Sequence, residues 1–171
     1  MKIKVSTIAF SKNARLVNEL KQHFPETTVN ESGIRLKDKK LYQYFDDAEG
    51  VIVGLEKVDA VFLDALPNIK VIAKYGVGLD NIDLDACKER GVQIGWTPGV
   101  NKSSVAEMTL GFMLALFRNL YITSNQLKYE KTWNKNGGAQ LSGKTVGIIG
   151  LGNIGKKVVQ LLKPFNCNIL A

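Results

Sequence analysis

The chain has 171 residues, of which 45% are hydrophobic and 23% are charged. These proportions provide enough apolar side chains for a hydrophobic core, so they exclude a disordered or collagen-like chain. The longest apolar stretch, residues 108–117, contains Thr109 and Gly111 and is too short to cross a bilayer core about 30 Å thick. We therefore expect a globular protein that does not enter a membrane.

The formal net charge is +7, which raises the possibility of nucleic-acid binding. The basic residues are scattered, and Asp38 interrupts the densest cluster, which consists of Lys37, Lys39 and Lys40. No helix-turn-helix, RNP or zinc pattern accompanies the charge, so we expect no nucleic-acid partner.

Two further observations concern location and metals. The N-terminus alternates Lys2 and Lys4 with apolar residues and has no apolar core of a signal peptide, so we expect a cytoplasmic protein. Cys87 and Cys167 are far apart and have no metal-ligand spacing. We therefore expect reduced structural thiols and no metal site.

Short apolar segments alternate with amphipathic ones through the first hundred residues. Asn13 is placed to cap a helix that Pro25 ends, and Asp83 to cap a second helix that Gly91 ends. This alternation predicts the α/β class, with a doubly wound parallel sheet that closes at the turn 97–99. The expected strands are 3–9, 51–53, 70–74 and 92–96, and the expected helices are 13–24, 39–45, 58–65 and 83–90.

A different pattern begins after residue 99. Ser104 and Glu107 have the spacing of a capping box, which predicts a long helix reaching Asn119. This helix is apolar on most of its faces, so we expect it to be buried on nearly all sides. The more polar segment 121–141, which contains Trp133, is typical of an arm or a connection.

A glycine-rich turn follows the apolar run 145–149. Gly150, Gly152 and Gly155 form the pattern Gly-x-Gly-x-x-Gly, between a predicted strand at 146–149 and a predicted helix at 153–162. In dinucleotide-binding units the first glycine permits the turn, the second lets the backbone approach the pyrophosphate, and the third lets the helix pack on the strand. Glycines after a strand also mark plain tight turns, but the strand-turn-helix context favours dinucleotide binding.

A second glycine pair follows the predicted strand 70–74. In open parallel sheets ligands gather at the carboxyl ends of the strands, so the N–H groups of Val77 and Gly78 could hold a small carboxylate. A tight turn into Asp80 and Asn81 explains the same residues equally well. The pattern alone leaves both interpretations open.

Three blocks of the sequence together carry a family resemblance. The segments 70–83, 97–109 and 143–155 occur in the order and spacing of the D-isomer-specific 2-hydroxyacid dehydrogenases. The chain resembles in particular their phosphoglycerate dehydrogenase-like branch. The resemblance extends over the whole chain and is weaker before residue 51.

The resemblance implies an NAD-dependent oxidoreductase, with NADP not excluded, that transfers a hydride to or from the CH–OH group of a small D-2-hydroxy acid or its 2-keto acid. It implies a flavodoxin-like substrate domain over residues 1–99, followed over residues 100–171 by the start of a Rossmann NAD-binding domain. The segment 121–141 matches the family's dimerisation arm, which implies a homodimer with Trp133 at the subunit contact. The implied substrate-binding residues are Val77, Gly78 and Asn101, and the implied cofactor-binding residues are Gly150, Gly152, Asn153, Ile154 and Gly155.

The family supplies its catalytic arginine, glutamate and histidine from its C-terminal half, so the resemblance implies no catalytic residue in this chain. The single histidine, His23, is expected at the surface, while Glu107 and Arg118 are expected to serve the long helix. We therefore expect an N-terminal portion of the enzyme that binds cofactor poorly and has no turnover. Two strands and one helix of the Rossmann unit are also expected to leave Val146, Ile148, Val158 and Leu162 uncovered.

One departure from the family pattern bears on the substrate. Phosphoglycerate dehydrogenases tend to have an Arg-Ser pair where this chain has Gly54 and Leu55. This puts 3-phosphoglycerate in doubt and leaves glycerate, glyoxylate-type and lactate-like substrates open, with Lys74 as a partial substitute for the missing cation. Two other functions also remain open, namely a non-catalytic module that senses a dinucleotide and a fragment that only dimerises.

Overall fold

The computed structural model describes residues 1–135 and 137–171. The chain folds as two compact units, Met1–Pro98 and Gly99–Ala171, which we call unit 1 and unit 2.

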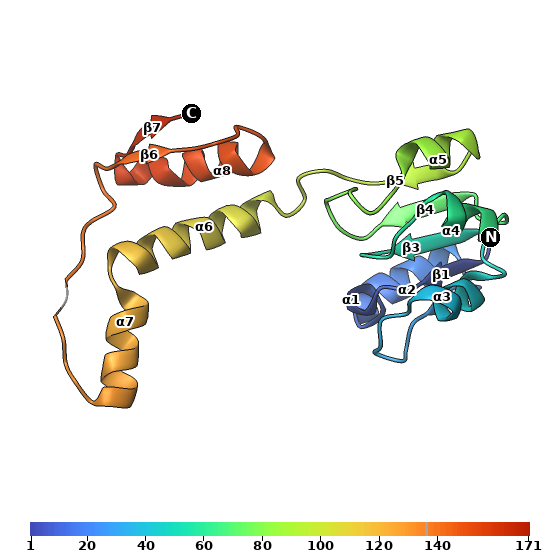
Figure 1. Ribbon diagram of the computed structural model, residues 1–171, viewed down its shortest axis with the longest axis horizontal. Helices are drawn as coiled ribbons and strands as arrows, with labels where there is room; N and C mark the ends of the chain where they lie inside the picture. The colour runs from blue at the N-terminus through green and yellow to red at the C-terminus, as the bar shows by residue number, and fades with distance from the viewer. Residues whose placement is uncertain (136) are drawn as a thin grey trace. The chain divides into compact units, whose positions relative to one another are not determined.

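Unit 1 is built on a five-stranded sheet in which every neighbouring pair of strands is parallel (Figure 1). The strand order is β2-β1-β3-β4-β5. This is the flavodoxin-like order, so the predicted α/β class and flavodoxin-like unit are confirmed. The strands are β1 (Ile3–Val5), β2 (Thr28–Val29), β3 (Gly50–Val53), β4 (Val71–Lys74) and β5 (Gln93–Gly95).

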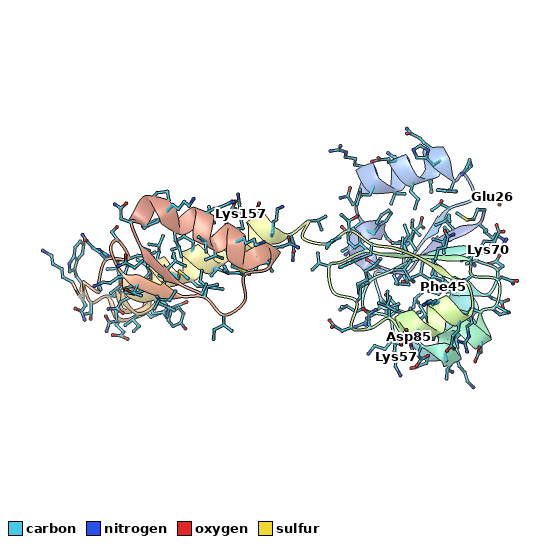
Figure 2. The ribbon with its side chains drawn as sticks, turned by 90° about the horizontal axis from the view of Figure 1, so that it is seen from above. Glu26, Phe45, Lys57, Lys70, Asp85 and Lys157 are labelled. Carbon is cyan, nitrogen blue, oxygen red and sulfur yellow. The ribbon has the colours of Figure 1, made fainter. Side chains whose placement is uncertain are left out.

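Five helices connect these strands, and Figure 2 shows helices on both sides of the sheet. They are α1 (Ile8–Ser11), α2 (Ala14–His23), α3 (Asp38–Phe45), α4 (Ala60–Ala65) and α5 (Leu84–Glu89). The helices α3, α4 and α5 contribute to the larger core, in which Phe45 and Phe62 are fully buried against Val51 and Ile72. The helices α1 and α2 pack around Val5 in a separate core.

Side-chain caps begin two helices where the sequence predicts them. The Asn13 carboxamide oxygen accepts a hydrogen bond from the Leu16 N–H at 3.2 Å, and the Asp83 carboxylate accepts one from the Ala86 N–H at 2.9 Å. Gly91 follows α5 with a φ of +67°, a left-handed conformation that favours glycine. These boundaries are confirmed.

Two predicted boundaries in unit 1 are wrong. The first strand was expected to continue to residue 9, but it ends at Val5, because the Thr7 hydroxyl accepts a hydrogen bond from the Phe10 N–H and starts α1. The predicted helix 58–65 begins two residues later, because Val58 forms a parallel bridge with Ile82 and Asp59 caps the helix. In both cases a local side-chain acceptor ends the extended conformation.

Acid is expected to destabilise unit 1 through two carboxylates, the exposed Asp47 and the partly buried Glu49. Asp47 contacts the ammonium groups of Lys2 and Lys4, and Glu49 pairs with Lys70 at 2.9 Å. Hydrogen bonds from these cations lower the pKa of Asp47 and of Glu49 to about 2, from ordinary values of 3.8 and 4.5. A lowered carboxyl pKa stabilises the folded state above the unfolded pKa, and this stabilisation is lost as the pH falls toward 2.

We therefore expect the free energy of unfolding to fall between about pH 5 and pH 2, and the Asp47→Asn, Glu49→Gln double variant to show a shallower fall. Urea unfolding at several pH values measures the slope. The Glu19→Gln variant, altered at an exposed position of α2, is the control and should keep the original slope. Identical acid slopes in the double variant and the original chain would contradict this account.

Unit 2 contains the predicted strand-turn-helix-strand segment. The strands β6 (Thr145–Gly147) and β7 (Asn168–Leu170) form a parallel pair, and α8 (Asn153–Leu162) connects them through a 3-10 turn at Lys163–Phe165. Before them come the helices α6 (Lys102–Phe117) and α7 (Leu120–Asn125), then a π-helical turn at Gln126–Glu130. Figure 1 shows α8 running alongside β6.

The helix α6 covers α8, which corrects one expectation. Val158 and Leu162 were expected to be uncovered, but they are 5% and 0% exposed and form a core with Ala106 and Leu141. The expectation was wrong because it considered only the strands and helix after residue 145. A long helix from earlier in the chain provides the missing apolar surface.

Two expectations about α6 itself are also wrong. The helix begins at Lys102 with Asn101 as its N-cap residue, so Ser104 lies inside the first turn and does not cap it. The helix is also not buried on all sides, because Met108, Phe112 and Leu116 are between 55% and 77% exposed. These three residues are four positions apart and so form one apolar stripe along the helix.

Two further observations complete the description of the fold. Cys87 and Cys167 are both free thiols, as expected, and burial raises the pKa of the Cys87 thiol. Within residues 1–135 and 137–171, no single helix is long and apolar enough to cross a membrane. Only α6 taken together with Leu120–Glu130 reaches the required length, and this pair is bent by 69°.

Candidate functional site

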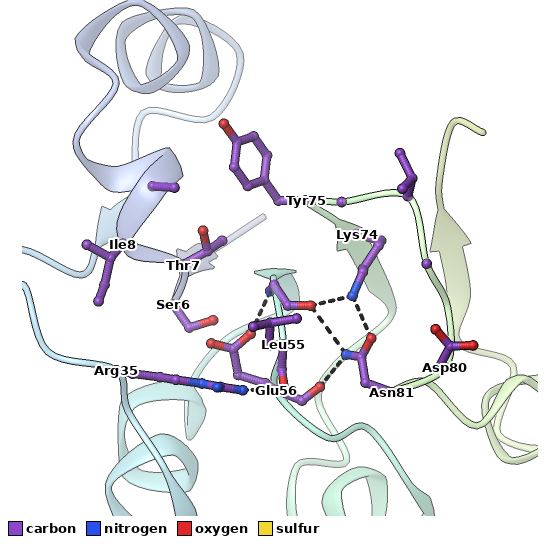
Figure 3. Close-up of a pocket in the computed structure, with 15 residues that line it drawn as sticks. Ser6, Thr7, Ile8, Arg35, Leu55, Glu56, Lys74, Tyr75, Asp80 and Asn81 are labelled. Carbon is purple, nitrogen blue, oxygen red and sulfur yellow. Dashed lines mark hydrogen bonds between the residues drawn. The ribbon is translucent and has the colours of Figure 1, made fainter. Parts of the chain in front are cut away.

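A cavity of about 430 Å³ opens in unit 1 at the carboxyl ends of β1, β3 and β4 (Figure 3). The sheet order changes direction between β1 and β3, and such a switch point leaves a crevice where ligands bind. The lining residues come from four segments. They include Ser6 and Thr7 after β1, Arg35 before α3, Gly54 to Glu56 after β3, and Lys74 to Gly78 with Asp80 and Asn81 at and after β4.

The predicted carboxylate-binding residues Val77 and Gly78 both line this cavity. Gly76, just before them, has a φ of +150°, a conformation that side chains other than glycine rarely adopt. Among the residues that the structure describes, no acceptor takes a hydrogen bond from the Val77 or Gly78 N–H. Two backbone donors are thus available to an anionic group in the cavity.

A tryptophan that the sequence reasoning did not select holds this loop in place. The Trp96 indole N–H, just after β5, donates a hydrogen bond to the Val77 carbonyl oxygen at 3.0 Å. Trp96 therefore connects the end of one strand to the loop that follows its neighbour. Its position after a strand was the available signal, since residues at strand carboxyl ends meet at one edge of the sheet.

Replacing Trp96 by phenylalanine is expected to weaken binding of a 2-hydroxy acid about threefold to tenfold, because a smaller aromatic ring remains but the hydrogen bond that orients the Val77 peptide is lost. Amide chemical-shift titration measures the affinity, and a Trp133→Phe variant controls for loss of an exposed indole. A role confined to packing predicts an unchanged affinity in Trp96→Phe, which would refute the positioning role.

A lysine is fixed at the back of the cavity. The Lys74 ammonium donates hydrogen bonds to the Gly54 carbonyl oxygen and, at 2.5 Å, to the Asn81 side-chain oxygen. The Asn81 amide in turn donates to the Gly54 and Glu56 carbonyl oxygens. Burial lowers the pKa of Lys74, against the opposing attraction of Glu56 and Asp80.

A buried carboxylate lies beside this lysine. Glu56 is 5% exposed, and its Oε2 atom accepts a hydrogen bond from the Gly54 N–H at 2.5 Å. Lys74 and Glu56 both bind Gly54, one through its carbonyl oxygen and the other through its N–H. Figure 3 shows the side chains of Lys74, Glu56 and Asn81 in this part of the cavity. The sequence reasoning missed Glu56, although an acidic residue two positions after Gly54, close to the end of a buried strand, was a usable signal.

The predicted cofactor residues lie together at the start of α8 in unit 2. Gly150 has a φ of +95°, and a Cβ atom on Gly155 would overlap the Gly150 carbonyl oxygen. Gly152 is the N-cap residue of α8 and makes no side-chain cap, while the first N–H groups of the helix have no partner within it. A hypothetical Cβ on Gly152 meets no atom within 4 Å, so the space above this turn is open.

Asn153 and Asn101 also belong to unit 2. The Asn153 side chain lies against Gly99, where an added Cβ would be 2.9 Å from its Cγ atom. The Asn101 carbonyl accepts the Val105 N–H at 3.0 Å and begins α6. Val77 and Gly78 lie in unit 1, so their grouping with Asn101 in one substrate site remains a prediction.

Three other residues considered from the sequence lie outside the cavity. His23 is the last residue of α2 and is exposed. Glu107, within α6, and Arg118, at its end, are both exposed as well. Their positions agree with the surface and helix roles expected for them.

Comparison with known proteins supports the same interpretation. The family model of the D-isomer specific 2-hydroxyacid dehydrogenase catalytic domain matches residues 7–163, which is most of the chain and includes both the cavity and the glycine motif. The chain belongs to this family.

Similar curated members of the D-2-hydroxyacid dehydrogenase family have several names. A hydroxypyruvate reductase of Thermotoga maritima is 42% identical over 71% of this chain and 40% of its own length. A glyoxylate reductase of Thermofilum pendens is 40% identical over 67% of this chain and 35% of its own length. A D-3-phosphoglycerate dehydrogenase of Methanocaldococcus jannaschii is 38% identical over 79% of this chain and 26% of its own length. The chain thus spans well under half of the length of these relatives.

Similar solved structures agree with the fold. The TT0316 protein of Thermus thermophilus matches with a TM-score of 0.87 and 28% identity, over 99% of this chain and 55% of its own. An NAD⁺-bound 3-phosphoglycerate dehydrogenase of Entamoeba histolytica matches with a TM-score of 0.75 and 30% identity, over 99% and 52%. An NAD complex of a formate dehydrogenase of Staphylococcus aureus matches with a TM-score of 0.78 and 27% identity, over 99% and 55%.

Proposed function

We propose that this chain forms the substrate-carboxylate site and the pyrophosphate-binding turn of an NAD-dependent D-2-hydroxyacid dehydrogenase. The observation that carries the proposal is the pair of unused N–H groups at Val77 and Gly78, which line the cavity at the sheet's switch point in a chain of this family. In this assignment residues 1–99 belong to the substrate domain and residues 100–171 to the NAD-binding domain. The substrate is a small 2-hydroxy acid or its 2-keto acid.

The start of α8 fits the pyrophosphate of a dinucleotide. The N–H groups at Gly152, Asn153 and Ile154 carry the positive end of the helix dipole, which attracts phosphate oxygens. Gly150 and Gly155 hold the turn close to the helix, and Gly152 leaves its upper side free of a side chain. The basic residues also favour this ligand, because residues 99–171 contain far more lysines and arginines than acidic residues.

The NAD complexes of two similar structures favour NAD as the cofactor. When bound, the nicotinamide accepts or supplies the hydride. This chain's own contribution is to bind and orient: the loop at Val77 and Gly78 holds the substrate carboxylate, and the α8 turn holds the pyrophosphate. Hydride transfer to the 2-keto acid also needs a cation that polarises the ketone and a general acid, with a pKa near neutral, that gives a proton to the ketone oxygen. The cavity of unit 1 has no histidine among its lining residues.

We therefore expect the 171-residue chain by itself to bind NAD more weakly than micromolar and to have no measurable turnover. Isothermal calorimetry with NAD and with NADP measures binding, and NADH absorbance with hydroxypyruvate or glyoxylate measures turnover. Micromolar binding or sustained NADH oxidation by the chain alone would contradict this expectation.

We further propose that the family member assembles as a homodimer through α6, α7 and the segment after them. Apolar side chains gather here to an extent that isolated exposed residues do not explain. Those at least half exposed in this region are Met108, Phe112, Leu116, Leu120, Tyr121, Ile122, Leu127, Tyr129 and Trp133. A second copy of the chain is the proposed partner, because the same apolar stripe on each copy can form a symmetric, self-complementary contact.

A further inference from the structure

The cavity in unit 1 has charged groups of both signs. Arg35 and Lys74 supply two cations, and Glu56 and Asp80 supply two carboxylates. The Arg35 guanidinium binds the backbone, because it donates a hydrogen bond to the Leu55 carbonyl oxygen. The cavity is therefore close to neutral before any ligand enters.

Glu56 is the more buried of the two acidic residues that line this cavity, since Asp80 is exposed. Glu56 is only 5% exposed, and its Oε2 atom accepts a hydrogen bond from the Gly54 N–H. Within the described part of the chain, no group donates a hydrogen bond to its other oxygen, Oε1. Among the described residues, Oε1 is also absent from the buried oxygens that have no partner, so it keeps some access to solvent and can accept a hydrogen bond from a ligand in the cavity.

Lys74 restricts what that donor can be. Its ammonium has three N–H donors, of which two are used by Gly54 and Asn81. Lys74 and Glu56 bind the two polar backbone atoms of Gly54, and among the described residues they are not an ion pair within 4 Å, although the Glu56 charge still attracts the ammonium group. A cationic ligand group would be repelled by Lys74, and an anionic one by Glu56. A hydroxyl group suits both, since it donates to a carboxylate and accepts from an ammonium.

We propose that Glu56 selects substrates by their distal group: it accepts a hydrogen bond from a hydroxyl on the carbon beyond the reacting centre and disfavours a phosphate at that position. The proposal rests on the proposed function, because the Val77 and Gly78 N–H groups must first hold the carboxylate of the same molecule. Glu56 is a specificity residue and takes no part in the hydride transfer.

Three ligands on one three-carbon skeleton test this proposal. D-Glycerate has the distal hydroxyl, D-lactate lacks it, and 3-phospho-D-glycerate replaces it with a phosphate ester. The affinity of each for the 171-residue chain is measured from shifts of backbone amide NMR signals, with Gly54, Val77 and Gly78 as reporters. The wild-type chain is expected to bind D-glycerate about tenfold more tightly than D-lactate, and 3-phospho-D-glycerate more weakly than either.

Two variants locate the effect at Glu56. Glu56→Gln keeps the size and can still accept from Gly54, so it is expected to gain at least about tenfold in affinity for the phosphate ester. Glu19→Gln removes the same charge from an exposed position on α2 and is expected to leave all three affinities unchanged. Because the order of the three wild-type affinities needs no substitution, the test stands even if Glu56→Gln fails to fold.

The outcomes separate the two proposals. Equal affinity for D-glycerate and D-lactate, or wild-type binding of the phosphate ester as tight as that of D-glycerate, overturns the role of Glu56 while the cavity remains a hydroxy-acid site. If none of the three ligands shifts the reporter amides at millimolar concentration, the carboxylate site itself is refuted, and the role of Glu56 is refuted with it.

Discussion

Alanine at Gly152 is expected to weaken NAD binding at least about tenfold and to leave thermal stability nearly unchanged. An added Cβ at this position meets no atom of the chain within 4 Å, and its φ of −74° is ordinary for any residue. The methyl group would instead occupy the space where a pyrophosphate approaches the helix N-terminus. Amide-shift titration with NAD measures the affinity, and a thermal melt measures the stability.

Alanine at Gly155 provides the matched comparison and is expected to act on the fold. Its Cβ would overlap the Gly150 carbonyl oxygen, so the turn and α8 must separate. Such a backbone overlap is expected to cost about 2 kcal/mol or more, which lowers the melting temperature by roughly 4 to 8 °C in a chain of this size. If Gly152→Ala melts early, or if it binds NAD normally, the pyrophosphate role of this turn is wrong.

A glutamate at Phe112, on the exposed stripe of α6, is expected to convert a dimer into monomers. Phe112 is 62% exposed and Leu116, one turn further along, is 77% exposed. Burying a charge in an apolar contact without a partner is costly, so we expect the dissociation constant of the dimer to rise at least about a hundredfold. Sedimentation equilibrium over a range of concentrations measures this change.

The control for this substitution is Gln160→Glu, which introduces the same charge at an exposed position of α8 away from the stripe. It should leave the dimer intact. A wild-type chain that remains monomeric at about 100 µM, well above the range expected for a stable interface, would exclude the proposed homodimer. A Phe112→Glu variant that still dimerises would place the interface elsewhere.

Most of unit 1 could be predicted from the sequence because its signals are local. Asn13, Asp83 and Gly91 determine helix ends through contacts a few residues away, and the apolar runs 51–53 and 70–74 are strands with only small changes at their ends. The prediction failed at Thr7, where a capping hydroxyl ends an apolar stretch that otherwise suits a strand.

The errors in unit 2 arise from long-range contacts. Periodicity indicates that α6 is apolar on most faces, but it cannot distinguish a face that packs inside the chain from one left exposed. The structure places Ala106 against Val158, while Phe112 faces outward. The coverage of Leu162 by a helix from earlier in the chain was missed for the same reason.

The sequence predicted the backbone groups of the candidate site but not the side chains that complete it. Val77 and Gly78 follow a strand and a glycine, and the rule for ligands at strand ends selects them directly. Glu56 and Trp96 matter through the directions of their side chains, which depend on the sheet order and the neighbouring loops. A search for polar residues at every strand end would have included both.

The central claim, that unit 1 holds the acid and unit 2 holds the dinucleotide, is tested most directly by two titrations of the ¹⁵N-labelled chain. D-Glycerate is expected to shift the amide signals of Val77 and Gly78, and NAD those of residues 150–155, each at millimolar concentration. Shifts confined to other regions, or no shifts with either ligand, would contradict the proposed sites.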